Sequence, residues 1–99
     1  MTRFVVYANA DGRGYLLDVQ ANLLRTLNTR VVVPLLPERE APSRAKVLNP
    51  VFDVEGAAHV MATQFMAAVP ISLLQREVLD LGPRAHEVVA ALDCLFQGV

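Results

Sequence analysis

The chain has no tryptophan, a single cysteine, few aromatic residues and few charges. Cys94 alone cannot form a disulfide within the chain, and such cysteine usage favours a reducing compartment. Charged residues make up 19% of the 99 positions and the formal net charge is -1, so a basic surface for nucleic acid or anionic membranes is missing. No apolar run approaches the roughly 18 residues of a membrane span. We therefore expect a cytoplasmic protein that binds neither nucleic acid directly nor membranes.

Apolar residues, by contrast, make up 54% of the sequence. A chain of this length can bury one modest core, so we expect one domain over residues 1–99. The apolar content exceeds what so small a core needs. Some of the excess should be covered by a partner.

Short runs rich in β-branched and aromatic residues predict strands. Residues 3–8 (RFVVYA) and 15–19 flank a turn at residues 9–14, which predicts a β-hairpin. The glycines of that turn supply positive φ angles, and because a strand follows rather than a helix, a phosphate-binding loop is disfavoured. Residues 51–63 predict a second hairpin that turns at Glu55 and Gly56.

Residues 30–36 (RVVVPLL) are the strongest predicted strand, although Pro34 lacks an N–H group and should lie at a sheet edge or bulge. Residues 68–74 predict a short last strand. Residues 21–29 predict a loop or short helical turn with exposed leucines. Residues 37–50, with three prolines and five charges, predict a long surface excursion.

The clearest predicted element is a helix that begins near Gly82 and Pro83 and ends at Gly98. Its apolar positions recur at spacings of three and four. They are Ala85, Val88, Val89, Leu92, Leu95 and Phe96. Strands followed by one amphipathic helix predict an α+β, mainly β fold, an antiparallel sheet with a helix at its end or on its face.

Catalytic patterns are absent from the sequence. His59 and His86 have no histidine or cysteine at metal-ligand spacing, and Cys94 has no evident partner base. The acidic residues Glu77, Asp80, Glu87 and Asp93 are interpreted as the solvated face of a helix-rich segment. We expect no catalytic residue, metal or cofactor, and a binding function that involves the apolar C-terminus and the Leu23–Leu24 pair.

Six short pieces, in this order and spacing, resemble the CcdB family of bacterial toxins. They are FVVY (4–7), LLDVQANLL (16–24), RVVVPL (30–35), VPIS (69–72), REVLDL (76–81) and LFQGV (95–99). The resemblance implies an antiparallel sheet of SH3-like barrel character that carries a smaller sheet and a C-terminal helix. It also implies a two-fold homodimer.

Proteins of that family poison the A subunit of DNA gyrase and are neutralised by a cognate antitoxin. The resemblance carries the gyrase-binding set over to Leu23, Leu24, Asp93, Phe96, Gln97, Gly98 and Val99. It places Leu95 at the dimer interface. No catalysis is implied.

Two residues of this set differ from the family pattern. The pattern has a tryptophan where this chain has Gln97, and an asparagine where it has Asp93. A tryptophan offers a flat face to a gyrase arginine, and loss of such a hot spot costs about 2 to 4 kcal/mol. Two alternatives therefore stay open. One is a gyrase-inactive relic that retains antitoxin binding and operon autoregulation, and the other is an RNase toxin on the same scaffold.

Overall fold

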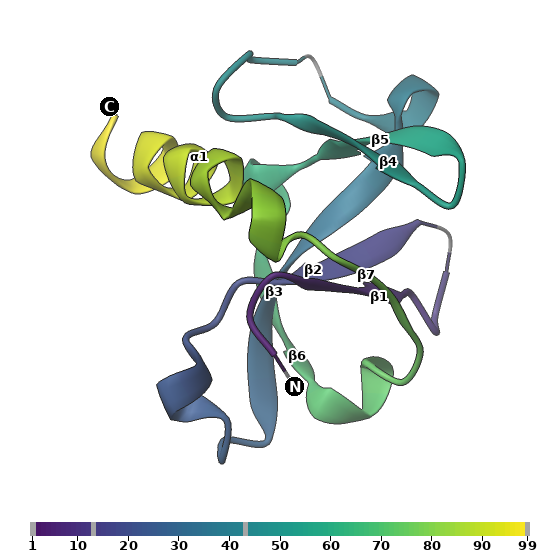
Figure 1. Ribbon diagram of the computed structural model, residues 1–99, viewed down its shortest axis with the longest axis vertical. Coiled ribbons are helices and arrows are strands. Elements are labelled where there is room, and N and C mark those ends of the chain that lie inside the picture. The colour runs from purple at the N-terminus through teal and green to yellow at the C-terminus, as the bar shows by residue number, and fades with distance from the viewer. Residues whose placement is uncertain (1, 13, 43, 99) are drawn as a thin grey trace.

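The computed structural model describes residues 2–12, 14–42 and 44–98, which form a curled antiparallel sheet with one α-helix against it (Figure 1). The strands are β1 (Val5–Ala8), β2 (Tyr15–Asp18), β3 (Thr29–Pro37), β4 (Val51–Val54), β5 (Ala57–Met61), β6 (Ala67–Pro70) and β7 (Glu77–Asp80). The helix is α1 (Ala85–Gln97), and short 3-10 turns join several elements. The predicted α+β, mainly β class is confirmed.

Strand β3 is the centre of the sheet, whose order is β4-β5-β3-β2-β1-β7 with β6 also paired to β3. One side of β3 pairs with β2. Its other side pairs first with β6, from Thr29 to Val32, and then with β5, from Leu35 to Pro37. The sheet therefore divides along β3, and its two halves curl away from each other.

Pro34 lies where β3 changes partners. Its carbonyl accepts a hydrogen bond from the Ala62 N–H at 2.9 Å. The pairing with β6 ends at Val32 and the pairing with β5 begins at Leu35, so neither strand needs a backbone N–H from Pro34. The prediction placed the position of Pro34 at a sheet edge or bulge. Strand β3 is central, but Pro34 has no register partner on the side of β3 that faces β5 and β6. The physical constraint still holds locally, since the missing N–H falls in the gap between β6 and β5.

Two groups of buried side chains form the core. The smaller lies inside the curl and contains Val5, Tyr7, Leu16, Val32 and Leu74. The larger includes Val6, Leu17, Leu35, Phe52 and Met61 from the strands and Val88 and Ala91 from α1. Successive residues of β1 and β2 point into different groups, as the period of two in a strand requires.

Three sequence predictions differ from the structure. Glu77 and Asp80 belong to strand β7, not to a helix-rich segment, because this run pairs with β1. Strand β6 ends at Pro70, and a 3-10 turn over Ile71–Leu73 follows it. On α1 the buried residues are Val88 and Ala91, whereas Phe96 is 69% exposed and lies beyond the core.

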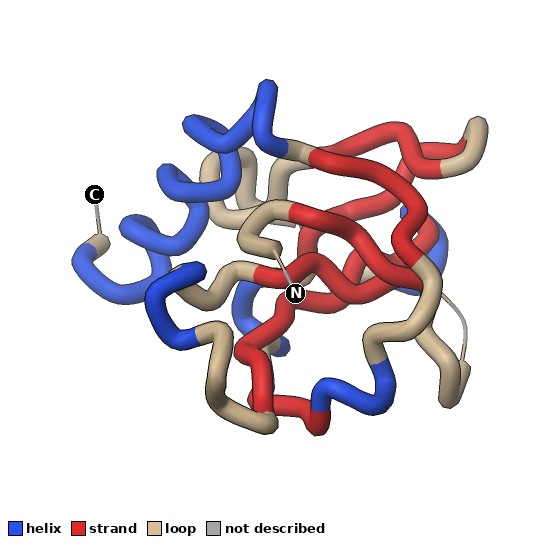
Figure 2. The backbone as a smooth tube through the Cα atoms, turned by 60° about the horizontal axis from the view of Figure 1, so that its bottom comes forward, coloured by secondary structure: helices blue, strands red, loops and turns tan. Residues whose placement is uncertain are grey.

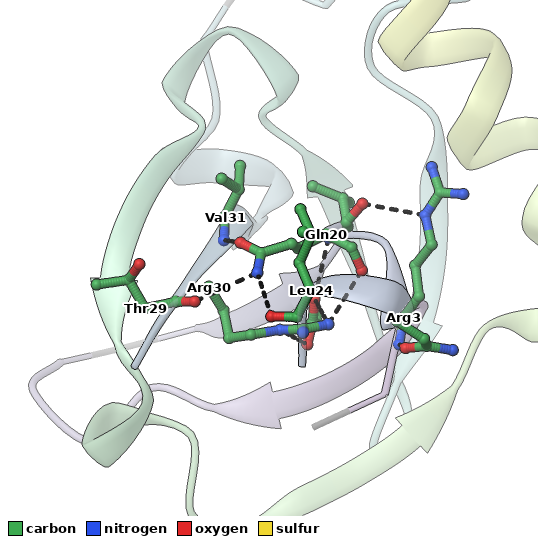
Figure 3. Close-up of polar contacts among 9 residues, drawn as sticks. Arg3, Gln20, Leu24, Thr29, Arg30 and Val31 are labelled. Atoms are coloured by element: carbon green, nitrogen blue, oxygen red, sulfur yellow. Dashed lines mark hydrogen bonds and ion pairs between the residues drawn. The ribbon is translucent and has the colours of Figure 1, made fainter. Parts of the chain in front are cut away.

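A buried ion pair joins β2 to β3 below the loop that connects them (Figure 3). Arg30 donates to the two carboxylate oxygens of Asp18 over 2.8 and 2.9 Å, and both side chains are fully buried. Arg30 also donates to the backbone carbonyl of Gln20 at 3.0 Å. Removing one partner would leave the other charge desolvated and unpaired, which is strongly destabilising.

We predict that Asp18→Asn lowers the free energy of unfolding by about 3 to 5 kcal/mol, because Arg30 then keeps its charge without a counterion. Urea unfolding followed by circular dichroism measures the change. The exposed Arg25→Ala in the same loop is the matched control and should change stability by less than about 0.5 kcal/mol. Equal stability of Asp18→Asn and the wild type would contradict the prediction.

Candidate functional site

The loop between β2 and β3 presents two leucines to solvent. Leu23 is 87% exposed and Leu24 is 45% exposed, and both lie in a 3-10 turn over Asn22–Leu24. This confirms the predicted short helical turn with exposed leucines. Polar groups hold the loop, because the Arg3 N–H donates to the Asn22 side chain at 2.8 Å and the Gln20 amide donates to the Leu24 carbonyl at 3.3 Å.

The end of α1 forms the second part of the candidate site. Asp93, Phe96 and Gln97 are three and four residues apart and therefore share one helix face. Phe96 and Gln97 are exposed, and Asp93 is half-buried. Gly98 ends the helix in the left-handed region with φ of 73°, and its N–H bonds the Cys94 carbonyl at 3.1 Å, which confirms the predicted C-cap.

These two parts lie on the same side of the molecule. Figures 1 and 2 both place the turn at Asn22–Leu24 on the side toward which the C-terminal half of α1 points. The structure therefore places the Asn22–Leu24 turn and the helix end, which are about 70 residues apart in sequence, on the same side of the molecule. Val99, the last residue of the set, lies outside the described residues.

Leu95 occupies a different face of α1 from Phe96. It follows the buried Val88 and Ala91 along the helix and is itself only half-buried. Phe65, in a 3-10 turn that packs beside α1, is 52% exposed. The apolar stripe of the helix thus continues past the core onto the surface.

The start of α1 is anchored by Arg84. Its guanidinium contacts the Glu87 carboxylate through two 2.7 Å bonds, lies 4.4 Å from the Phe52 ring centroid and donates to the Val51 carbonyl at 3.3 Å. These contacts connect α1 to β4. The hydrogen bonds from Arg84 lower the pKa of Glu87 and raise that of Arg84.

Tertiary structure also assembles a polar cluster at the β4–β5 turn. The Tyr15 hydroxyl donates to Glu55 at 2.5 Å, which raises the pKa of Tyr15 and lowers that of Glu55, and Arg76 lies 3.4 Å from the second oxygen of Glu55. The His59 ring packs edge-on against the Tyr15 ring, and 4.9 Å separates the two ring centroids. His59 thus has a structural role here, and the cluster fastens the turn to β2.

This polar cluster was missed by the sequence analysis. Tyr15 and Glu55 lie 40 positions apart and had been assigned only to a strand and a turn. Glu55 adopts a φ of 50°, which few residues other than glycine favour, but no sequence pattern signals it.

The described ranges 2–12, 14–42 and 44–98 hold no group of three or more His, Cys, Asp and Glu side chains arranged for a metal ion. Within the same ranges, no helix is long and apolar enough to cross a membrane.

We predict that Glu87→Gln lowers stability at pH 7 by up to about 1 kcal/mol, because the pair with Arg84 is partly exposed. The pKa of Glu87 in the folded protein is below its ordinary value. The ion pair therefore contributes its full stability when the pH is above the ordinary pKa, and this stability is lost as the pH falls through the lowered pKa of the folded protein. The difference in melting temperature between variant and wild type should therefore shrink at pH 3. Glu38→Gln, at an exposed position, is the control, and a difference that grows in acid would contradict the prediction.

Comparison with known families agrees with this geometry. The family model described as CcdB protein matches residues 3–98, nearly the whole chain. The curled sheet, the divided pairing of β3 and the C-terminal helix agree with the fold that this family implies. The chain therefore belongs to the CcdB family, a family of toxins from toxin-antitoxin modules.

Proposed function

We propose that this protein is the toxin of a type II toxin-antitoxin module that binds the A subunit of DNA gyrase as a cytoplasmic homodimer, without catalysis. A cognate antitoxin neutralises it. The observation that carries the proposal is the exposed apolar end of α1, with Phe96 at 69% exposure, on the same side as the exposed Leu23. Exposed apolar side chains grouped on one side of a small protein are typical of a protein interface.

The proposed mechanism is differential binding. The anchored start of α1 and the Gly98 cap hold the helix end in one conformation, so little entropy is lost on binding. A dimer that fits the cleaved, open state of gyrase better than the resting state shifts the enzyme toward that state. The size of the shift equals the difference in affinity for the two states.

Gln97 favours a second candidate function. It is exposed at the helix end, where the family pattern has tryptophan, and an amide cannot reproduce the aromatic face. The second candidate is a relic that still binds its antitoxin and takes part in operon autoregulation. Antitoxin contacts elsewhere on the surface would be unaffected by this substitution.

Induced expression of the wild type and Gln97→Trp separates the two candidates. Tryptophan should strengthen gyrase binding by roughly 30- to 1,000-fold, which corresponds to about 2 to 4 kcal/mol. Growth and DNA double-strand breaks are measured with and without the cognate antitoxin. Gln75→Trp, at an exposed position outside the set, is the matched control.

Breaks with the wild-type chain support the gyrase poison, and breaks with Gln97→Trp alone support the relic. Growth arrest without breaks in either strain would contradict gyrase poisoning.

The proposed dimer is tested by Leu95→Glu. Carboxylates that approach each other across a two-fold axis repel, so this variant should sediment as a monomer at concentrations where the wild type is a dimer. Analytical ultracentrifugation provides the measurement. Leu27→Glu, at a 48% exposed loop position, is the control and should remain dimeric. A Leu95→Glu protein that stays dimeric would contradict this interface.

A further inference from the structure

The loop between β2 and β3 has a defined 3-10 turn although none of its residues is buried. Residues 21–28, which form the loop, are all exposed, with Leu23 at 87% and Leu24 at 45%. The turn over Asn22–Leu24 has no side-chain cap at its start. Burial of apolar side chains therefore does not fix this loop, and its conformation depends on polar contacts from residues outside it.

Gln20, the residue that precedes the loop, bridges it with its side chain (Figure 3). The side-chain carbonyl of Gln20 accepts from the Val31 N–H at 3.0 Å. The side-chain amide donates to the Leu24 carbonyl at 3.3 Å and to the Thr29 carbonyl at 3.4 Å. One side chain thus joins the turn in the middle of the loop to the start of β3.

The backbone of Gln20 is itself fixed to the core. Its N–H donates to the Asp18 carboxylate at 3.0 Å, and its carbonyl accepts from the Arg30 guanidinium at 3.0 Å. Asp18 and Arg30 are fully buried and form an ion pair with each other. The residue that bridges the loop is therefore attached to the most rigid part of the sheet nearby.

Two backbone groups also reach the loop from outside. The Arg3 N–H donates to the Asn22 side chain at 2.8 Å, and the Ile71 N–H donates to the Asn28 carbonyl at 3.1 Å. They hold the turn and the end of the loop separately, whereas Gln20 connects the turn to β3. A change of the Gln20 side chain removes this connection and leaves both backbone groups in place.

Order in this loop before binding bears directly on affinity. A partner that contacts Leu23 and Leu24 must otherwise fix the backbone around them, and the lost conformational entropy weakens the complex. A loop already held in its bound shape avoids most of that loss. The strength of binding through the two leucines then depends on what holds the turn.

We propose that Gln20 is a positioning residue for partner binding. It raises affinity without contacting the partner, because its side chain holds the turn that presents Leu23 and Leu24. The inference rests on the proposed function, in which this turn faces the A subunit of gyrase. It adds a residue outside the set that the family resemblance assigns to that surface.

The first test needs no gyrase and measures amide hydrogen exchange by NMR. Gln20→Met preserves the length of the side chain and removes its three hydrogen bonds. Exchange should accelerate roughly ten-fold at Leu24, Arg25 and Leu27, whose N–H groups bond carbonyls within the loop, and should change little in β1. Gln20→Glu, which retains only the acceptor for the Val31 N–H, should accelerate the same amides.

Gln75→Met is the matched control. The Gln75 amide also donates to a carbonyl of a 3-10 turn, at Ser72, but on a different loop. This variant should leave exchange in residues 21–28 as it is in the wild type. Unchanged loop exchange in Gln20→Met, or acceleration spread equally over the loop and β1, would overturn the inference.

The second test measures affinity for the purified A subunit of gyrase by surface plasmon resonance. Gln20→Met should weaken binding roughly ten-fold, whereas Gln75→Met should bind as the wild type does. In a chain that carries Leu23→Ser and Leu24→Ser, Gln20→Met should have no further effect, because the side chains that it positions are gone.

A loss of affinity that persists in the chain without the two leucines would overturn the positioning role, since a loss of stability alone acts equally in both chains. Absence of gyrase binding by the wild type would overturn the proposed function instead. The exchange measurement still decides in that case whether Gln20 holds the turn.

Discussion

Strand β3 imposes the constraint on which the rest of the structure depends, because it is shared by both halves of the sheet. It pairs with β2 along one side and with β6 and then β5 along the other. A continuous partner on that second side would require an N–H at Pro34. The proline thus coincides with the point where the second side of β3 changes its partner from β6 to β5.

The same strand carries Arg30 near its start, and the buried pair with Asp18 joins the ends of β2 and β3 between which the loop with the exposed Leu23 and Leu24 runs. The pair is costly to desolvate, and Arg30 donates through Nε and Nη2 to Asp18 and to the Gln20 carbonyl, while its buried Nη1 has no hydrogen-bond partner among the described residues. Its position connects fold to function. The pair ties together the two strand ends from which the loop with the two leucines extends.

Helix α1 has a different role at each end. Arg84 anchors its start to β4 through the Val51 carbonyl and the Phe52 ring. Its other end leaves the core after Ala91 and presents Phe96 to solvent.

Local signals in the sequence determined the hairpins, the helix, the Gly98 cap and the mainly β class, because turn residues and periodicity act over a few positions. The family resemblance added the candidate site. Only the tertiary structure decided that Glu77–Asp80 is a strand, that Phe96 lies outside the core, and that Glu55 meets Tyr15. Each of these depends on pairing between distant segments, and such contacts have no local pattern. The placement of the Asn22–Leu24 turn on the same side as the helix end has the same origin.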